Sequence, residues 1–140
     1  MKCEAYIDGS SLGNPGEAGY GVVIYESGNH SEYLMAVGVY IGQGTNNTAE
    51  YSGLLGCLKL TAAMNISELV VNSDSELLVR QVNGEYKVKQ PHLLKMYNQI
   101  CSIIKQSDFD FIIRHVPREK NKEADRLAKK AAMLKQNITG

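Results

Sequence analysis

The chain has 140 residues, of which 44% are hydrophobic and 21% are charged, and its formal net charge is zero. These values fit one globular domain over residues 1–140, large enough to bury about two-thirds of its unfolded surface. No apolar run reaches the roughly 18 residues of a membrane-spanning helix, and no signal-peptide hydrophobic region follows Met1. The sequence therefore predicts a soluble, cytoplasmic protein without a membrane partner, which we expect to be a monomer.

The zero net charge hides an asymmetry between the two parts of the chain. Residues 1–79 carry two basic and nine acidic side chains, whereas residues 80–140 carry thirteen basic and six acidic ones. This distribution indicates an acidic pocket beside a basic contact surface. A solvated exterior with chance clustering would give the same counts, so the charges alone leave both interpretations open.

The first third of the chain predicts three strands in a meander. Lys2 to Asp8 alternates apolar and polar residues, and the glycine- and proline-rich segment 9–16 follows, so we expect the first strand to end at Asp8. Segments 20–25 and 32–40 are rich in valine, isoleucine and tyrosine and predict two more strands. Cys3 shares a face of the first strand with apolar residues, which favours core packing over thiol chemistry.

The next part of the chain predicts a helix, a strand and a second helix. Asn47 is a candidate N-cap with Glu50 as its capping-box partner, and the helix should run to about Met64. The apolar strand 68–72 leads into Ser73-Asp74-Ser75, which should open a helix that ends near residue 83.

The last third predicts a helix at 91–106, a strand at 109–116 and a C-terminal helix from Asn121 to about Lys135. Strands followed by alternating helices and strands indicate an α/β fold, with a mixed sheet of five strands flanked by helices.

Four acidic residues stand at the ends of these predicted elements. Asp8 ends the first strand, and Asp74 follows the fourth. Glu50 and Asp125 lie in the first turns of the first and last helices. Groups at the carboxyl ends of parallel strands converge in an open α/β sheet, so Asp8 and Asp74 would be neighbours if their strands pair in parallel.

Four clustered carboxylates favour a metal site. Carboxylates brought together raise one another's pKa, and bound cations relieve the repulsion. Hard divalent ions prefer oxygen ligands, and a pair of ions about 3.5–4 Å apart can activate a water and stabilise a leaving oxygen during phosphodiester cleavage. The acids therefore predict a site for two Mg²⁺ ions, with Mn²⁺ as an alternative.

Each acid also has a structural interpretation. Glu50 fits a capping box, Asp74 fits a helix cap, and Asp125 fits an acid that stabilises a helix dipole. Asp8 is harder to explain in this way because aspartate is depleted within strands, although an Asx-turn could hold it.

Several motifs occur in order along nearly the whole chain. They are Asp8-Gly9-Ser10, Gly13-Asn14-Pro15-Gly16, Gly19-Tyr20-Gly21, Thr45-Asn46-Asn47 before Ala49-Glu50, Ser73-Asp74-Ser75, and Asn121-x-x-Ala124-Asp125-x-Leu127-Ala128. In this order and spacing they resemble the type 1 ribonuclease H family, and in particular its handle-less, reverse-transcriptase-like subgroup. The resemblance implies a ribonuclease H-like fold and a two-metal-ion endonuclease that cuts the RNA strand of RNA–DNA hybrids.

The resemblance also implies roles for individual residues. The metal-binding, catalytic acids would be Asp8, Glu50, Asp74 and Asp125. The candidate substrate-binding residues are Gly9, Ser10, Asn14, Thr45, Asn46, Asn47 and Glu76. Short amide and backbone groups can read a ribose 2′-hydroxyl across the shallow minor groove of a hybrid. Thr45 and Asn46 equally fit ordinary turn and cap positions.

The sequence departs from the family pattern in three places. The short link 84–90 has no room for the basic protrusion of many bacterial members. Contacts with a duplex must then come from other basic residues, such as Lys87, Lys89, Arg114, Arg118, Lys120 and Lys122. The mobile-loop histidine of those members is missing, and His115 falls on the last predicted strand. Glu76 stands where many members have glutamine.

Two other functions are compatible with parts of this pattern. A module that binds hybrids or duplex RNA with weak or no nuclease activity would fit the missing protrusion and Glu76. A receiver-like signalling domain also places acids and one Mg²⁺ at strand ends, but it needs paired acids after the first strand, where this chain has Asp8-Gly9.

Overall fold

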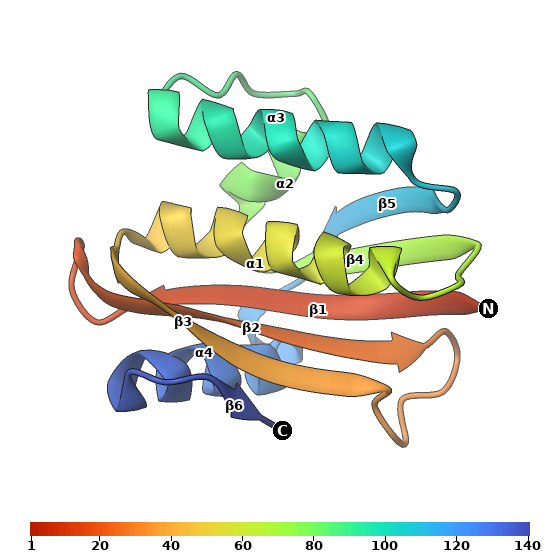
Figure 1. Ribbon diagram of the computed structural model, residues 1–140, viewed down its shortest axis with the longest axis horizontal. Helices are drawn as coiled ribbons and strands as arrows, with labels where there is room; N and C mark the ends of the chain where they lie inside the picture. The colour runs from red at the N-terminus through yellow and green to blue at the C-terminus, as the bar shows by residue number, and fades with distance from the viewer.

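The computed structural model describes residues 1–140, which form one mixed sheet with helices on both faces (Figure 1). The strands are β1 (Lys2–Ser11), β2 (Gly16–Glu26), β3 (Met35–Gly44), β4 (Glu68–Ser73), β5 (Asp110–His115) and β6 (Ile138–Thr139). The helices are α1 (Asn46–Ala62), α2 (Glu76–Val82), α3 (Pro91–Gln106) and α4 (Lys122–Leu134), with a 3₁₀ turn at Arg118–Lys120. None of these helices combines the length and apolar character needed to cross a lipid bilayer.

The sheet has the strand order β5-β4-β1-β2-β3-β6. β1 pairs with β2 in the antiparallel sense and with β4 in parallel, and β5 continues the parallel half. α1 packs on β1 and β2 with α3 stacked on it, whereas α4 packs on β1, β2 and β3 from the opposite face (Figure 1). The predicted mixed sheet flanked by helices is confirmed, and the first and fourth strands are parallel neighbours as the site requires.

The first hairpin is longer than predicted. β1 does not end at Asp8 but continues to Ser11, because Gly9, Ser10 and Ser11 pair with Tyr20, Gly19 and Ala18 of β2. Small residues that indicate a loop in the sequence are here accommodated in a regular ladder. β3 is likewise displaced toward residue 44, and the two-residue β6 adds a sixth strand that the sequence pattern does not show.

The predicted helices are present, but two begin differently. The N-cap of α1 is Thr45, whose hydroxyl accepts from the Thr48 amide at 3.1 Å, so the predicted capping box of Asn47 and Glu50 is wrong. The N-cap of α2 is Ser75 rather than Asp74. Neither Glu50 nor Asp74 is therefore explained as a helix cap.

The main core lies between the sheet and α1. Cys3, Ala5 and Ile7 of β1 are fully buried and pack with apolar residues of α1 and β4. A smaller cluster on the other face joins Val23 of β2 to Leu127 of α4. Cys3 therefore packs in the core as predicted, and all three cysteines are free thiols.

α4 approaches the sheet closely at Gly21. A Cβ atom built on Gly21 would lie 2.1 Å from the carbonyl oxygen of Ala124, a backbone atom that cannot rotate away. The backbone of α4 therefore contacts the backbone of β2 at Gly21. This contact fixes the distance between the sheet and the first turn of α4, which carries Asp125.

We predict that Gly21→Ala destabilises the protein by about 1–3 kcal/mol, because the added methyl group must push α4 away from the sheet. Urea denaturation would measure the loss. Gly44→Ala is the matched control, since a Cβ there meets no atom closer than 3.5 Å. Equal stabilities of the two variants would contradict this role for Gly21.

Candidate active site

Parallel pairing of β1 and β4 brings the first two acids together. Ile7 of β1 is paired with Ser73 of β4, so the residues that follow them, Asp8 and Asp74, stand side by side. Asp8 is 5% exposed, and the side chain of Asp74 is 10% exposed. Strand register alone therefore places two nearly buried carboxyl groups next to each other.

A glycine allows α1 to add the third acid. A Cβ atom on Gly9 would lie 2.4 Å from the carbonyl carbon of Ala49 and from the amide nitrogen of Glu50. No side chain fits between β1 and the first turns of α1 at this point. Gly9 therefore permits the close approach that places Glu50 beside Asp8.

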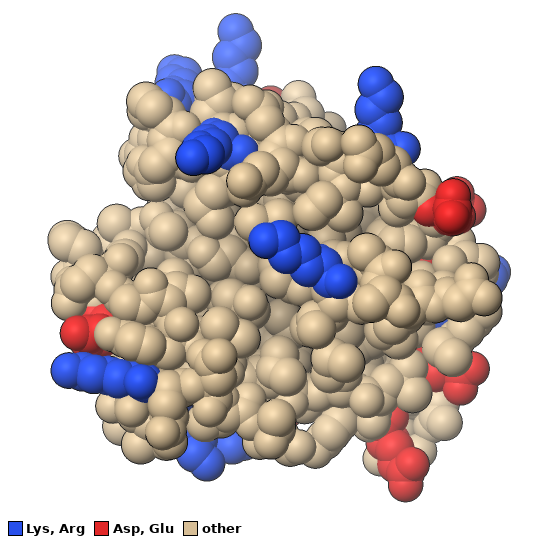
Figure 2. Space-filling model, in the orientation of Figure 1, with Lys and Arg blue, Asp and Glu red and all other residues tan.

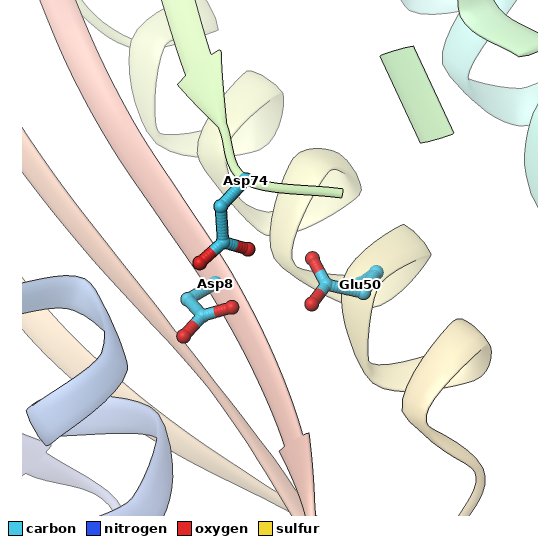
Figure 3. Close-up of side chains that lie close together, drawn as sticks. All are labelled: Asp8, Glu50 and Asp74. Atoms are coloured by element: carbon cyan, nitrogen blue, oxygen red, sulfur yellow. The ribbon is translucent and has the colours of Figure 1, made fainter. Parts of the chain in front are cut away.

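The carboxyl groups of Asp8, Glu50 and Asp74 converge on one point (Figure 3). One oxygen atom from each lies within 4.8 Å of those of the other two. Oxygen Oε2 of Glu50 is buried and has no hydrogen-bond partner. A buried carboxylate oxygen without a donor is costly, so this oxygen of Glu50 lacks the partner that would compensate its burial.

Asp125 approaches the same cluster from α4. It shares with the other three acids a polar cleft of about 310 Å³ whose lining includes no hydrophobic residue. Oxygen Oδ2 of Asp125 lies 3.1 Å from the ammonium nitrogen of Lys129, one turn further along α4. All four predicted acids therefore face one cleft, three of them in close mutual contact and the fourth paired with a lysine.

The crowding of carboxylates shifts their protonation. Burial raises the pKa of Asp8 well above its usual range, and the negative charge of Glu50 and the neighbouring carboxyl groups of Asp125 and Asp74 raise it further. Burial also raises the pKa of Glu50, to about 7, with Asp74 adding to the shift and hydrogen bonds from Asp8 and Gly9 opposing it. Without a cation, the cluster therefore retains protons near neutral pH.

The residues present fit divalent metal ions. Several carboxylate oxygens, one of them without any donor, form the oxygen-rich ligand set that Mg²⁺ and Mn²⁺ prefer. A cation would supply the missing positive charge and reverse the upward pKa shifts of Asp8 and Glu50.

The predicted substrate-binding residues divide into two groups. Gly9, Ser10, Asn46 and Asn47 line the cleft with the acids. Asn14, Thr45 and Glu76 do not line it.

The residues of the second group make structural contacts outside the cleft. Asn14 accepts from the Asn46 amide at 3.2 Å and so joins the loop after β1 to the start of α1. Thr45 is the cap of α1. Glu76 is 60% exposed and forms an ion pair with Arg80 at 3.1 Å.

Three residues of the cleft lining were not predicted as site residues from the sequence. Ser75 and Lys129 line the cleft, but the sequence analysis gave neither of them a role in the site. Lys129 lies four residues after Asp125, the spacing at which helical side chains meet. Arg118, considered only for duplex grip, also lines the cleft, with its Nε 4.0 Å from Oδ2 of Asp74. His115 lies on β5 as predicted and is absent from the cleft lining.

A mixed sheet of this order, with acids meeting where β1 and β4 lie side by side, defines an α/β domain of the ribonuclease H-like fold. The model of the reverse transcriptase-like family matches residues 6–131. The crystal structure of LC11-RNase H1 in complex with RNA/DNA hybrid superimposes with a TM-score of 0.88 and 39% identity, covering 96% of this chain and 99% of that one.

Two relatives extend the comparison. A ribonuclease H of Syntrophus aciditrophicus is 32% identical over 145 residues, covering 91% of this chain and 78% of the relative. The bifunctional protein Rv2228c of Mycobacterium tuberculosis is 42% identical over 134 residues, covering 94% of this chain but only 35% of the relative's length. The chain therefore belongs to the type 1 ribonuclease H family, in its reverse transcriptase-like group. The family works with divalent metal ions, in agreement with the acidic cluster.

The raised pKa values predict that the metal-free protein loses stability as pH rises. The unfolded chain releases the protons of Asp8 and Glu50 near pH 4, whereas the folded state retains them until about pH 7 or above. The free energy of unfolding should therefore fall between about pH 4 and pH 7. Thermal denaturation in EDTA across this range would measure the fall.

The variant Asp8→Asn tests the same repulsion without a change of pH. In EDTA at pH 7.5 it should raise Tm by roughly 3–8 °C, since the wild-type carboxyl group must take up a proton on folding and the amide of the variant need not. Added Mn²⁺ should stabilise the wild-type protein more than the variant. A variant that melts below the wild-type protein in EDTA would show that Asp8 is not under electrostatic strain.

Proposed function

We propose that this chain is an endonuclease that hydrolyses the RNA strand of RNA–DNA hybrids with two divalent metal ions, Mg²⁺ by preference and Mn²⁺ as a substitute. The observation that carries the proposal is the convergence of Asp8, Glu50 and Asp74, with a buried unpartnered oxygen, in a fold shared with a ribonuclease H solved on RNA/DNA hybrid. The resemblance of the ordered motifs to the same family supports it.

The residues of the cleft would have separate roles in metal binding and in substrate contact. Asp8, Glu50, Asp74 and Asp125 would hold the ions, which when bound activate the attacking water and stabilise the leaving 3′-oxygen. Asn46 and Asn47 stand at the cleft beside the acids, where amide groups suit contacts with a ribose 2′-hydroxyl and a phosphate. Arg118 is 88% exposed at the cleft and offers a positive charge to the phosphate backbone.

Grip on the duplex would come from basic residues outside the cleft. Lysine and arginine side chains gather over α3, at the top of Figure 2, whereas the middle of this face carries few charges. Lys95 and Lys105 lie on α3, and Lys87 and Lys89 lie on the link that precedes it. This group occupies the part of the chain where other family members insert a basic protrusion, and its affinity for a hybrid should fall steeply with salt.

A cleavage assay tests the proposal. With Mg²⁺ or Mn²⁺ the protein should cut a labelled RNA–DNA hybrid, and should leave duplex RNA and single-stranded RNA largely intact. Asp8→Asn and Asp74→Asn should each lower the rate by at least about 100-fold, since each removes a metal ligand. Asp110→Asn is the matched control, because Asp110 lies exposed on β5 away from the cleft, and it should cleave at the wild-type rate.

The binding-module alternative has a distinct outcome. If the wild-type protein shifts the hybrid on a gel but leaves it uncut with either ion, it binds hybrids without hydrolysing them, and the endonuclease proposal fails. The monomeric state, the single-domain organisation and the cytoplasmic location expected from the sequence stay predictions.

A further inference from the structure

The side chain of Gln81 on α2 is buried and joins three parts of the chain. It is 7% exposed, and its oxygen accepts a hydrogen bond from the hydroxyl group of Tyr51 on α1, which is itself 1% exposed. Its nitrogen donates to the backbone carbonyl of Lys87, on the link after α2, at 3.2 Å. A buried amide is costly unless both of its ends have partners, and here both have one. Gln81 therefore forms a hydrogen-bonded bridge between α1, α2 and the link.

The link depends on this bridge because its own backbone supplies little order. Lys87, Val88 and Lys89 lie outside the helices and strands, and they form no hydrogen bond between backbone groups. Val88 is partly buried against the main core, whereas the lysines on either side of it are exposed. The hydrogen bond from Gln81 and the packing of Val88 therefore hold this segment in place.

The acidic residues near the link are paired with Arg80. Its guanidinium group lies 2.9 Å from a carboxylate oxygen of Glu85 and 3.1 Å from one of Glu76. Lys87 and Lys89 form no ion pair with any acid. Their ammonium groups are therefore free to bind a phosphate.

The link lies within reach of a duplex bound at the cleft. α2 has seven residues and begins directly after Ser75, which lines the cleft. At about 1.5 Å per residue, this helix spans roughly 10 Å. A nucleic-acid duplex carries about one phosphate charge per 1.7 Å of its axis, so a bound hybrid has phosphates at this distance. Tyr51 directly follows Glu50, so the bridge is anchored on the helical turn that carries an acid of the cleft.

We propose that Gln81 is a positioning residue that holds the link through its hydrogen bonds, so that Lys87 and Lys89 form a preformed contact for the phosphate backbone of the hybrid. This inference rests on the proposed function. A preformed contact binds more tightly because the segment loses little conformational freedom when the hybrid arrives. Lysines on a segment that is not held would carry the same charge and bind more weakly.

The first measurement is the rate at which trypsin cuts the native protein after Lys87 and Lys89, determined by mass spectrometry. Gln81→Met keeps the length of the side chain and removes both hydrogen bonds. It should be cut at these lysines about 2- to 12-fold faster, the factor expected from the net loss of one hydrogen bond that holds the segment. Tyr51→Phe removes only the hydroxyl group and should change the rate in the same direction.

The matched control is Thr61→Val, at the other end of α1 from Tyr51. Thr61 is fully buried, and its hydroxyl group donates to the carbonyl of Cys57 at 3.0 Å. The control therefore loses a buried hydrogen bond, as Gln81→Met does, but it should be cut after Lys87 and Lys89 at the wild-type rate. A Gln81 side chain that merely stabilised the fold would give the same result as the control.

The second measurement is hybrid binding, followed by fluorescence anisotropy in Mg²⁺ with Asp74→Asn present in every variant to slow cleavage. Gln81→Met should weaken binding by about 2- to 10-fold, because the hybrid must then order the segment. Replacing Lys87 and Lys89 together by methionine should also weaken binding. Adding Gln81→Met to that pair should cause no further loss, since no lysine remains to be positioned. Additive losses would show that Gln81 does not act through these lysines.

The outcomes separate the two proposals. The trypsin measurement needs no substrate, so it tests the bridge even if the wild-type protein neither binds nor cuts the hybrid. In that case the proposed function fails, and the contact with the hybrid fails with it. If the wild-type protein cuts the hybrid, but Gln81→Met matches Thr61→Val in trypsin cutting or in hybrid binding, the proposed function stands and the role of Gln81 is rejected.

Discussion

Repulsion between buried carboxylates is the constraint on which the rest of this structure depends. Asp8 and Asp74 are brought together by strand register, and Glu50 is added by the contact of α1 with Gly9. Each step is fixed by backbone geometry, so the acids cannot separate without loss of the sheet or the helix contact. The folded chain stores unfavourable electrostatic energy at one point, and a cation at that point would release it.

Much of this arrangement could be predicted from the sequence. The acids interrupt patterns of strands and helices that are otherwise regular. The general behaviour of open α/β sheets predicts that Asp8 and Asp74 meet if the first and fourth strands pair in parallel, and the structure shows that they do. Helix α3 matches its predicted bounds because proline marks its start and the apolar period is clear. The motifs around the acids added the family and the role of Asp125.

Other features required the three-dimensional structure. The continuation of β1 through Gly9 to Ser11 depends on partners in β2, and local composition alone indicates a loop there. Thr45 and Asn47 are both good caps, and only the packed helix start shows that Thr45 is the one used. The pairing of Lys129 with Asp125 looks in the sequence like any ion pair on a helix surface, and only the structure shows that it lies in the cleft with the other three acids.

The contact of α4 with Gly21 bears on how the cleft can adjust. Because backbone meets backbone there, and Leu127 is packed in the cluster with Val23, α4 has little room to shift against the sheet. Rearrangement around Asp125 must therefore come from rotation about side-chain bonds, which in exposed residues takes picoseconds to nanoseconds, rather than from slow collective shifts of the helix. The scaffold behaves as a rigid frame, and its ability to respond to ligands is confined to a few long polar side chains at the cleft.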